Sequence, residues 1–254
     1  MLLTIDIGNT NITLGLFRDT LLCCTARLAT DVLKTSDQYA VEIKDILELH
    51  GETIAEVEDC IISSVVPAVG ASVSSAVTLL CDTVPLMLGP GVKTGLNIKI
   101  DNPAQLGADL AAGAVGALAE YTMPCIIIDM GTATTLSVLD KNGAFLGGSI
   151  ASGVHLTLKA LASGTAALPS IALTAPKAVI GTNTVECMQS GLIFGAAAML
   201  DGLIDRIEDE LGQSATIVAT GGLSKEIIAH SKKEIIYNEN LLLEGLRLIY
   251  EKNN

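Results

Sequence analysis

Two stretches of this chain share one pattern, LLTIDIGNTNITLGLF at residues 2–17 and CIIIDMGTATTLSVL at residues 125–139. Each has an apolar run that contains an aspartate, Asp6 or Asp129, followed two residues later by glycine, a short polar segment and a second apolar run. Two ordinary β-hairpins would explain the glycines, but they would favour Val or Ile in place of the aspartate. Because a carboxylate within an apolar strand is costly to bury without a partner such as a cation, the pattern indicates a duplicated functional element.

The repeat predicts an α/β fold with two related halves, residues 1–115 and 116–254. In each half a meander of three strands precedes helices and a further strand, an order typical of a mixed sheet with flanking helices. The two sheets are expected to face a cleft. The predicted strands are 2–7, 12–17, 21–28, 59–66, 125–130, 134–139, 144–150 and 215–220, and the predicted helices are 36–50, 105–118, 153–163, 183–211 and 224–230.

The charge of the chain limits its partners. The sequence has 254 residues, and its 28 acidic and 15 basic side chains give a net charge of −13. Such a surface repels phosphate backbones and anionic lipids, so neither nucleic acid nor a membrane is an expected partner. Backbone N–H groups, helix N-termini or a few placed cations must therefore hold any anionic substrate.

Hydropathy and cysteine spacing indicate a cytoplasmic protein. The mean hydropathy is +0.53, but no uninterrupted apolar run reaches the ~18 residues that a membrane-spanning helix needs. The first residues lack the basic segment of a signal peptide. The six cysteines show no CxxC spacing, which predicts free thiols in apolar segments rather than disulfides or a zinc site.

Three glycine-rich turns follow predicted strands, and they read GNTN at 8–11, GTATT at 131–135 and ATGGL at 219–223. Turns of this kind offer backbone N–H groups and hydroxyls to phosphate oxygens, and paired glycines let a ring or a sugar approach the backbone. One such turn alone is as often structural as functional. The three in this order are more specific, and the absence of GxxxxGK[ST] and GxGxxG excludes a P-loop and a Rossmann fingerprint.

This set of motifs resembles the acetate kinase, sugar kinase, Hsp70 and actin superfamily, in which two ribonuclease-H-like halves clamp ATP. Further segments are similar, in the same order and over essentially the whole chain, to type III pantothenate kinases. They read ISSVVP (62–67), GPGVKTGL (89–96), NPAQLGAD (102–109), GGSIASG (147–153), IGTNTVECMQSGLIFG (180–195) and NLLLEGLRLIYEKN (240–253).

The resemblance implies ATP-dependent phosphorylation of pantothenate, the first step of coenzyme A synthesis, by a cytoplasmic homodimer. It implies that Asp109 takes the proton from the pantothenate hydroxyl, and that Asp129 coordinates a monovalent cation, K⁺ or NH₄⁺. Asp6 would also contact Mg²⁺. The implied ATP-binding residues are Asp6, Gly8, Asn9, Thr10, Asn11, Thr132, Gly221 and Gly222, and the implied substrate-binding residues are Ile100, Gly107, Ala108, Asp109, Leu110 and Thr184.

Three departures from the family pattern fall on the pantothenate side. Leu110 replaces the arginine of a GADR motif, which is expected to pair with the acidic end of pantothenate. Ser152 replaces a proline, and Ile100 stands where the family often has tyrosine. Since the loop lacks its arginine, the candidates for a replacement cation are Lys93, Lys99 and His155.

Several alternatives remain open at this point. Asp109 alone could be a solvent-facing residue that the helix dipole favours. Leu110 could mark a kinase for a small alcohol without a carboxylate, or the chain could be a weakly active regulatory paralogue that binds nucleotide. The presence of Asp6, Asp109 and Asp129 favours an enzyme. The apolar stretch 183–200 could pack against a partner helix or within its own core.

Overall fold

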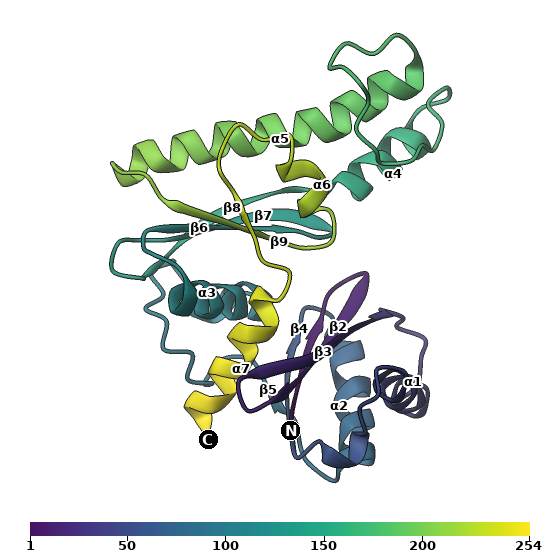
Figure 1. Cartoon of the computed structure of the whole chain (residues 1–254), viewed down its shortest axis with the longest axis vertical. Coiled ribbons are helices and arrows are strands. Elements are labelled where there is room, and N and C mark those ends of the chain that lie inside the picture. Colours follow the sequence, from purple (N-terminus) through teal and green to yellow (C-terminus); the bar gives the residue numbers. More distant parts are fainter. The chain divides into compact units, whose positions relative to one another are not determined.

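The computed structural model describes residues 1–254 and divides into two compact units (Figure 1). The C-terminal segment of the chain belongs to the first unit, and a four-residue segment from the first half of the sequence belongs to the second. The first unit comprises residues 1–96, 101–119 and 240–254, and the second comprises residues 97–100 and 120–239.

The two units contain mixed five-stranded sheets with the same topology. The strand order is β3-β2-β1-β4-β5 in the first sheet and β8-β7-β6-β9-β10 in the second. In both sheets neighbouring strands among the first three are antiparallel, and the last two strands are parallel to the central strand. The predicted mixed sheet in each half is therefore confirmed. The strands are β1 (Leu2–Ile7), β2 (Asn11–Arg18), β3 (Leu21–Ala29), β4 (Asp59–Ser64), β5 (Leu86–Met87), β6 (Cys125–Met130), β7 (Ala133–Leu139), β8 (Phe145–Ser152), β9 (Thr216–Thr220) and β10 (Ile236–Tyr237).

The helices include two that the sequence did not predict, α2 and α7. The predicted helix 105–118 begins later, because residues Pro103–Gln105 form a short 3₁₀ turn capped by the Asn102 side chain. The other predicted helices are present with ends that differ by at most two residues. The helices are α1 (Ser36–Leu49), η1 (Ile54–Glu56), α2 (Pro67–Cys81), η2 (Pro103–Gln105), α3 (Ala108–Glu120), α4 (Val154–Gly164), α5 (Thr184–Leu211), α6 (Ser224–Ile228) and α7 (Leu241–Asn253).

Helices cover both faces of the first sheet. Leu3, Ile5 and Ile7 of β1 are fully buried in the cluster that includes α1 and α2, which lie together on one side of the sheet in Figure 1. On the other face, Ile61 packs in a cluster with residues of α3 and α7. Since alternate residues of a strand point to opposite faces, Asp6 shares a face with Ile61 rather than with Ile5.

The second sheet buries one face under α4, α5 and α6. Ile126, Ile128 and Met130 of β6 pack in this cluster, and Figure 1 shows α5 running across the sheet as the longest helix. Asp129 stands between two of these residues and therefore points to the opposite face. The duplicated pattern of apolar residues around an aspartate thus places each aspartate away from the main cluster of its strand.

The helix α5 is long and apolar enough to cross a membrane by length and composition, with a mean hydropathy of 1.4 over 18 residues. Its sequence contains no uninterrupted apolar run of that length, because charged and polar residues break the run. Seven of its residues, among them Leu192, Ile193 and Leu200, are buried. The intramolecular core therefore takes up one face of this helix.

Free thiols are observed, as the cysteine spacing predicts. Cys60 and Cys125 are buried, and burial raises the pKa of both thiols. Cys187 is exposed at the start of α5.

Candidate active site

The first predicted phosphate loop is a tight turn between β1 and β2. The Gly8 N–H donates to the Asn11 carbonyl at 2.9 Å, and a side chain at Gly8 would approach the same oxygen to 3.2 Å. Asn9, Thr10 and Asn11 are exposed. The turn therefore presents three consecutive polar residues to solvent immediately after the strand that carries Asp6.

Thr30 braces this turn from the end of β3, a contact that the sequence motifs did not indicate. The Thr30 hydroxyl donates to the Gly8 carbonyl at 2.7 Å, and the Thr30 N–H donates to the Thr10 carbonyl at 3.0 Å. These two bonds tie the loop to the end of β3. In the sequence, the only sign of these bonds is that a threonine directly follows β3, the strand that pairs with β2.

The second predicted phosphate loop, between β6 and β7, packs against Gly153. The Gly131 N–H donates to the Ala133 carbonyl at 2.9 Å, and the Gly153 N–H donates to the Thr132 carbonyl at 3.0 Å. A methyl group on Gly153 would overlap the carbonyl oxygens of Gly131 and Thr132. This close approach explains why the GGSIASG segment ends in glycine, and it leaves Thr132 exposed.

The third glycine-rich turn contacts Asp129. Gly221 has a φ of +94°, which favours glycine, and a side chain there would lie 2.8 Å from Asp129 Oδ1 and 2.7 Å from the Met130 carbonyl oxygen. Gly222 beside it is exposed. The structure thus brings together three of the predicted elements of the second unit, namely Asp129, the loop of Thr132 and the ATGGL turn.

Asp109 is the second residue of α3, which begins at Ala108 directly after Gly107. Its Oδ1 accepts the Leu110 N–H at 2.8 Å, and a side chain at Gly107 would come within 2.5 Å of that oxygen. Burial raises the pKa of the Asp109 carboxyl, although two backbone hydrogen bonds act in the opposite direction. A partly desolvated carboxylate is a stronger proton acceptor than an exposed one, as a general base requires. Asp109 is thus half-buried rather than fully exposed, and its role as the base stays a prediction.

The candidate replacement cations have other positions or partners. Lys99 Nζ pairs with Asp140 at 2.9 Å, and this pairing, together with backbone bonds to the β7–β8 turn, lowers the pKa of Asp140 to about 2. The Lys93 side chain is exposed and its backbone bonds to Asn253. His155 is exposed on α4. No cation contributes to the pKa shift of Asp109.

The substituted positions 152 and 100 both contact glycine-bearing segments of the second unit. The Ser152 hydroxyl lies 2.9 Å from the Thr157 hydroxyl, and Thr157 Oγ1 donates to the Gly153 carbonyl at 3.1 Å. These bonds tie β8 to the first turn of α4. Ile100 faces Gly147, and a side chain at Gly147 would lie 3.7 Å from the Cγ2 methyl group of Ile100.

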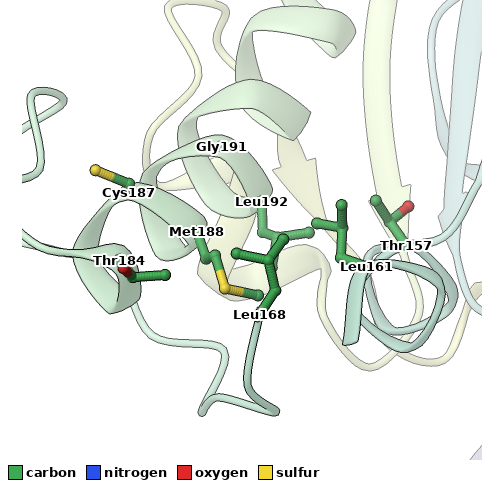
Figure 2. A pocket seen from close by; sticks show the side chains of 8 residues that line it. All are labelled: Thr157, Leu161, Leu168, Thr184, Cys187, Met188, Gly191 and Leu192. Atoms are coloured by element: carbon green, nitrogen blue, oxygen red, sulfur yellow. The ribbon is translucent and has the colours of Figure 1, made fainter. Parts of the chain in front are cut away.

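Thr184 stands at the rim of an apolar pocket between α4 and α5, with a volume of about 520 Å³. Figure 2 shows Leu161, Leu168, Met188 and Leu192 converging, with Thr184 at one end. The side chain of Asn183 caps α5 by accepting the Glu186 N–H at 3.0 Å, which fixes the start of the helix at Thr184. The lining residues are Thr157, Leu161, Leu168, Thr184, Cys187, Met188, Gly191 and Leu192.

No group of three or more His, Cys, Asp or Glu side chains is placed to hold a metal ion. Mg²⁺ in phosphoryl-transfer sites takes one or two carboxylates from the protein and otherwise phosphate oxygens and water. Asp6 and Asp129 are each a single carboxylate beside a polar loop. The single carboxylate of Asp6 therefore fits Mg²⁺ that arrives with phosphate and water ligands rather than a cage made by the protein.

Comparisons with known proteins agree with the motifs. A family model described as type III pantothenate kinase matches residues 2–206. A type III pantothenate kinase from an Exiguobacterium species is 42% identical over 253 residues, which cover 100% of this chain and 99% of the relative. The enzyme of the same description from Halalkalibacterium halodurans is 40% identical, and the match covers 100% of both chains.

Solved structures share the fold at low sequence identity. A conserved putative Baf family transcriptional activator from Campylobacter jejuni has a TM-score of 0.61 at 19% identity and covers 99% of this chain and 98% of its own. The activator of the 2-hydroxyisocaproyl-CoA dehydratase from Clostridium difficile, with bound ADPNP, has a TM-score of 0.58 at 14% identity and covers 98% and 94%. These likenesses show the α/β fold with two related sheets. Because the family model spans most of the sequence and full-length relatives are about 40% identical, the chain belongs to the type III pantothenate kinase family.

Proposed function

We propose that this chain transfers the γ-phosphoryl group of ATP to the hydroxyl of pantothenate and so forms 4′-phosphopantothenate, the first step of coenzyme A synthesis. Membership of the kinase family supports the reaction. The observation that carries the assignment of residues is Asp109, a partly buried carboxylate with a raised pKa, held by its own helix start and the Gly107 turn.

In the proposed reaction the pantothenate oxygen attacks the γ-phosphorus as the bond to the β,γ-bridging oxygen breaks, and ADP leaves. Asp109 accepts the hydroxyl proton. Asp6 would hold Mg²⁺ that arrives with ATP, and this cation would supply neutralisation of the phosphate charge. Since the enzyme carries a net charge of −13, backbone N–H groups of the glycine-rich loops are suited to hold the phosphates without basic side chains.

We assign the ATP contacts to Asp6 with Gly8, Asn9, Thr10 and Asn11, to Thr132, and to Gly221 and Gly222. The exposed polar residues of the first loop and the closeness of Gly221 to Asp129 support this assignment. We assign the monovalent cation, K⁺ or NH₄⁺, to Asp129. A bound cation there would offset the repulsion between ATP and an acidic protein.

We assign the pantothenate contacts to Ile100, Gly107, Ala108, Asp109, Leu110 and Thr184. Leu110 stands directly after the base, where the family motif has arginine, so the carboxylate of pantothenate lacks that arginine partner at this position. This observation favours a second candidate, a kinase for a small alcohol without a carboxylate.

One comparison separates the two candidates. Initial rates of ADP release are measured with pantothenate and with the alcohol in which its carboxylate is reduced, for the wild type and for Leu110→Arg. The proposed function predicts that the wild type prefers pantothenate and that Leu110→Arg lowers KM for pantothenate only. A wild type that prefers the reduced compound would support the second candidate. Nucleotide binding without turnover of either compound would instead support a regulatory paralogue.

We further propose that the enzyme is a cytoplasmic homodimer formed through the α4–α5 region. Val179, Ile180 and Val185 expose 67%, 84% and 41% of their surface, and Val185 adjoins the pocket residue Thr184. The Val179 carbonyl accepts a hydrogen bond from Ser190 of α5 at 2.6 Å, which holds this segment against the helix. Apolar surface of this kind, next to an open apolar pocket, is typical of a face that another chain covers.

A further inference from the structure

Two buried hydroxyl oxygens lack a hydrogen-bond partner, Ser63 Oγ and Thr135 Oγ1. Ser63 is fully buried. Most buried polar atoms in folded proteins are paired, and a hydroxyl left unpaired lowers stability relative to an apolar group of the same shape. Alanine at position 63 or valine at position 135 would avoid this cost, so the fold alone gives no reason for either hydroxyl.

The sheet registers place each of these hydroxyls beside one of the repeated aspartates. Ser63 of β4 is the partner of Asp6 on β1, and Thr135 of β7 is the partner of Asp129 on β6. Paired residues on adjacent strands point to the same face, and the strands are ~4.8 Å apart. Each unpaired hydroxyl therefore stands one strand away from an aspartate, on the face to which the carboxylate points.

The sequence repeat does not account for the positions of these two hydroxyls, because they lie on strands that do not correspond. The strand that corresponds to β4 in the second sheet is β9, whereas Thr135 lies on β7, on the other side of the central strand. The two units thus place an unpaired hydroxyl next to the aspartate from opposite sides. Buried hydroxyls elsewhere on the first sheet are satisfied locally, as with Thr4, whose Oγ1 donates to the Gly15 carbonyl at 3.1 Å.

We propose that Ser63 and Thr135 are positioning residues that donate a hydrogen bond to Asp6 and Asp129 when these carboxylates engage their cations. The inference rests on the proposed function, in which Asp6 faces Mg²⁺ with ATP and Asp129 faces the monovalent cation. A carboxylate has about four lone-pair sites, so a cation leaves others open to a donor. Groups that orient a metal ligand in this way change metal affinity by roughly 10- to 100-fold when they are removed.

The test compares Ser63→Ala and Thr135→Val with Thr4→Val, which removes a buried hydroxyl from the face that carries Asp6. The first readout is the Mg²⁺ or K⁺ concentration that gives half of the maximal rate of ADP release. The second readout needs no turnover: it is the Mg²⁺ or K⁺ concentration that gives half of the rise in Tm caused by a non-hydrolysable ATP analogue. The retained hydroxyl of Thr135→Ser provides a conservative variant.

The expected results differ between the two residues. Ser63→Ala raises the half-saturating Mg²⁺ concentration about tenfold and leaves that of K⁺ unchanged, whereas Thr135→Val raises that of K⁺ about tenfold and leaves that of Mg²⁺ unchanged. Thr135→Ser restores the wild-type value, and Thr4→Val lowers Tm without changing either cation requirement. In the absence of ligand, Ser63→Ala melts at the wild-type temperature or above it, because it removes an unsatisfied group.

Unchanged half-saturation by both cations in Ser63→Ala and Thr135→Val would overturn the inference. An equal shift for both cations in each variant would also overturn it, since that result would indicate a general loss of structure. Failure of the proposed function would look different: the wild type would release no ADP with pantothenate, while the Tm readout would still report on Ser63 and Thr135.

Discussion

Gly153 shows at the scale of one residue how the second phosphate loop is supported. A methyl group there would overlap the carbonyl oxygens of Gly131 and Thr132, so Gly153→Ala has to displace the loop. We expect a loss of about 1–3 kcal/mol in the free energy of unfolding, the usual cost of overpacking, together with weaker ATP binding. Urea denaturation and calorimetric titration with ATP measure the two effects.

Gly195→Ala is the matched control for this substitution. Gly195 lies within α5 and a side chain there meets nothing within 4 Å. Because alanine is the better helix former, this variant is expected to be more stable by up to about 1 kcal/mol, with unchanged ATP binding. Equal stability of the two variants would contradict the close approach that we describe at Gly153.

Asp109 makes a pH-dependent prediction. Because the pKa of Asp109 is raised, lowering the pH is expected to protonate the base at a higher pH than for an ordinary aspartate. The value of kcat/KM for pantothenate should therefore begin to fall above the usual pKa range of aspartate. Above this pKa the carboxylate is ionised in the folded protein, and its burial lowers the free energy of unfolding. This loss disappears at low pH, where Asp109 is protonated in both the folded and the unfolded state. Asp109→Asn is therefore expected to raise the free energy of unfolding at pH 7, by an amount that shrinks as the pH falls.

The measurements are a pH–rate profile and urea denaturation at several pH values. An acidic limb at the pKa of an ordinary exposed aspartate would argue against burial of Asp109, and so would an Asn variant that is less stable than the wild type at pH 7. An exposed carboxylate, Asp101, provides the control, since Asp101→Asn should alter neither profile.

The sequence indicated where the glycine-rich turns lie, but it did not indicate which residues support them. Asp6, Asp109 and Asp129 stand out because carboxylates interrupt apolar runs, and glycine-rich turns show where the backbone is open. Thr30 contacts a loop that lies 22 residues earlier in the chain, and Ser63 is placed beside Asp6 only by the register of β4 with β1. An isolated serine or threonine on a strand has no sequence pattern that distinguishes it from any other.

At the scale of elements, the segment 97–100 joins the second sheet at the start of β8. Phe145 exchanges backbone hydrogen bonds with Asn97 and Lys99, each at 2.8 Å, and Lys99 pairs with Asp140. Asp140 Oδ1 also accepts the N–H groups of Asn142 and Ala144 in the β7–β8 turn. The carboxylate thus stabilises its own turn and the segment that leads to the substrate loop.

We expect Asp140→Ala to cost more stability than Lys99→Met. The exposed ion pair alone contributes less than about 1 kcal/mol, whereas the alanine variant also loses two hydrogen bonds of the turn, each contributing about 1 kcal/mol or more. Because the folded-state pKa of Asp140 is lowered to about 2, its contribution is present above the usual pKa and is lost as the pH falls through about 2. Urea denaturation at pH 7 compares the variants, and equal losses would contradict the role of the turn.

The two missed helices differ in their local signal. The sequence of α2 has three Ser and three Val, which are weaker helix formers than alanine, and packing of Val69, Val73 and Ala76 against the first sheet stabilises it. The sequence of α7 is rich in Leu, Glu and basic residues, which favour a helix, so its pattern could have been recognised. Two-residue strands such as β5 are too short to show alternation.

At the scale of the whole molecule, the duplicated sequence predicts the duplicated sheet. Both sheets have the same order of five strands, and a DxG pattern stands at the end of each central strand. The compact units interleave along the chain, whereas the halves 1–115 and 116–254 stay a prediction about the repeat. The repeated DxG pattern is local, so it could not predict that α7, at the end of the chain, belongs to the first unit.

The proposed dimer makes a prediction about mass in solution. Ile180→Asp places a charge on a residue that is 84% exposed, next to the α4–α5 pocket, and Leu33→Asp does the same at a residue of the first unit that is 86% exposed. Light scattering after size-exclusion chromatography is expected to give the mass of a dimer for the wild type and Leu33→Asp, and of a monomer for Ile180→Asp. A monomeric wild type would contradict the proposal.

The central claim is that this acidic chain phosphorylates pantothenate with Asp109 as the base. The most direct test incubates the wild type and Asp109→Asn with ATP, Mg²⁺, K⁺ and pantothenate, and quantifies 4′-phosphopantothenate by mass spectrometry. Loss of a general base typically lowers the rate by ~10²–10⁴-fold. The account predicts product from the wild type and at least a hundredfold less from Asp109→Asn; no product from the wild type, or equal rates from both proteins, would contradict it.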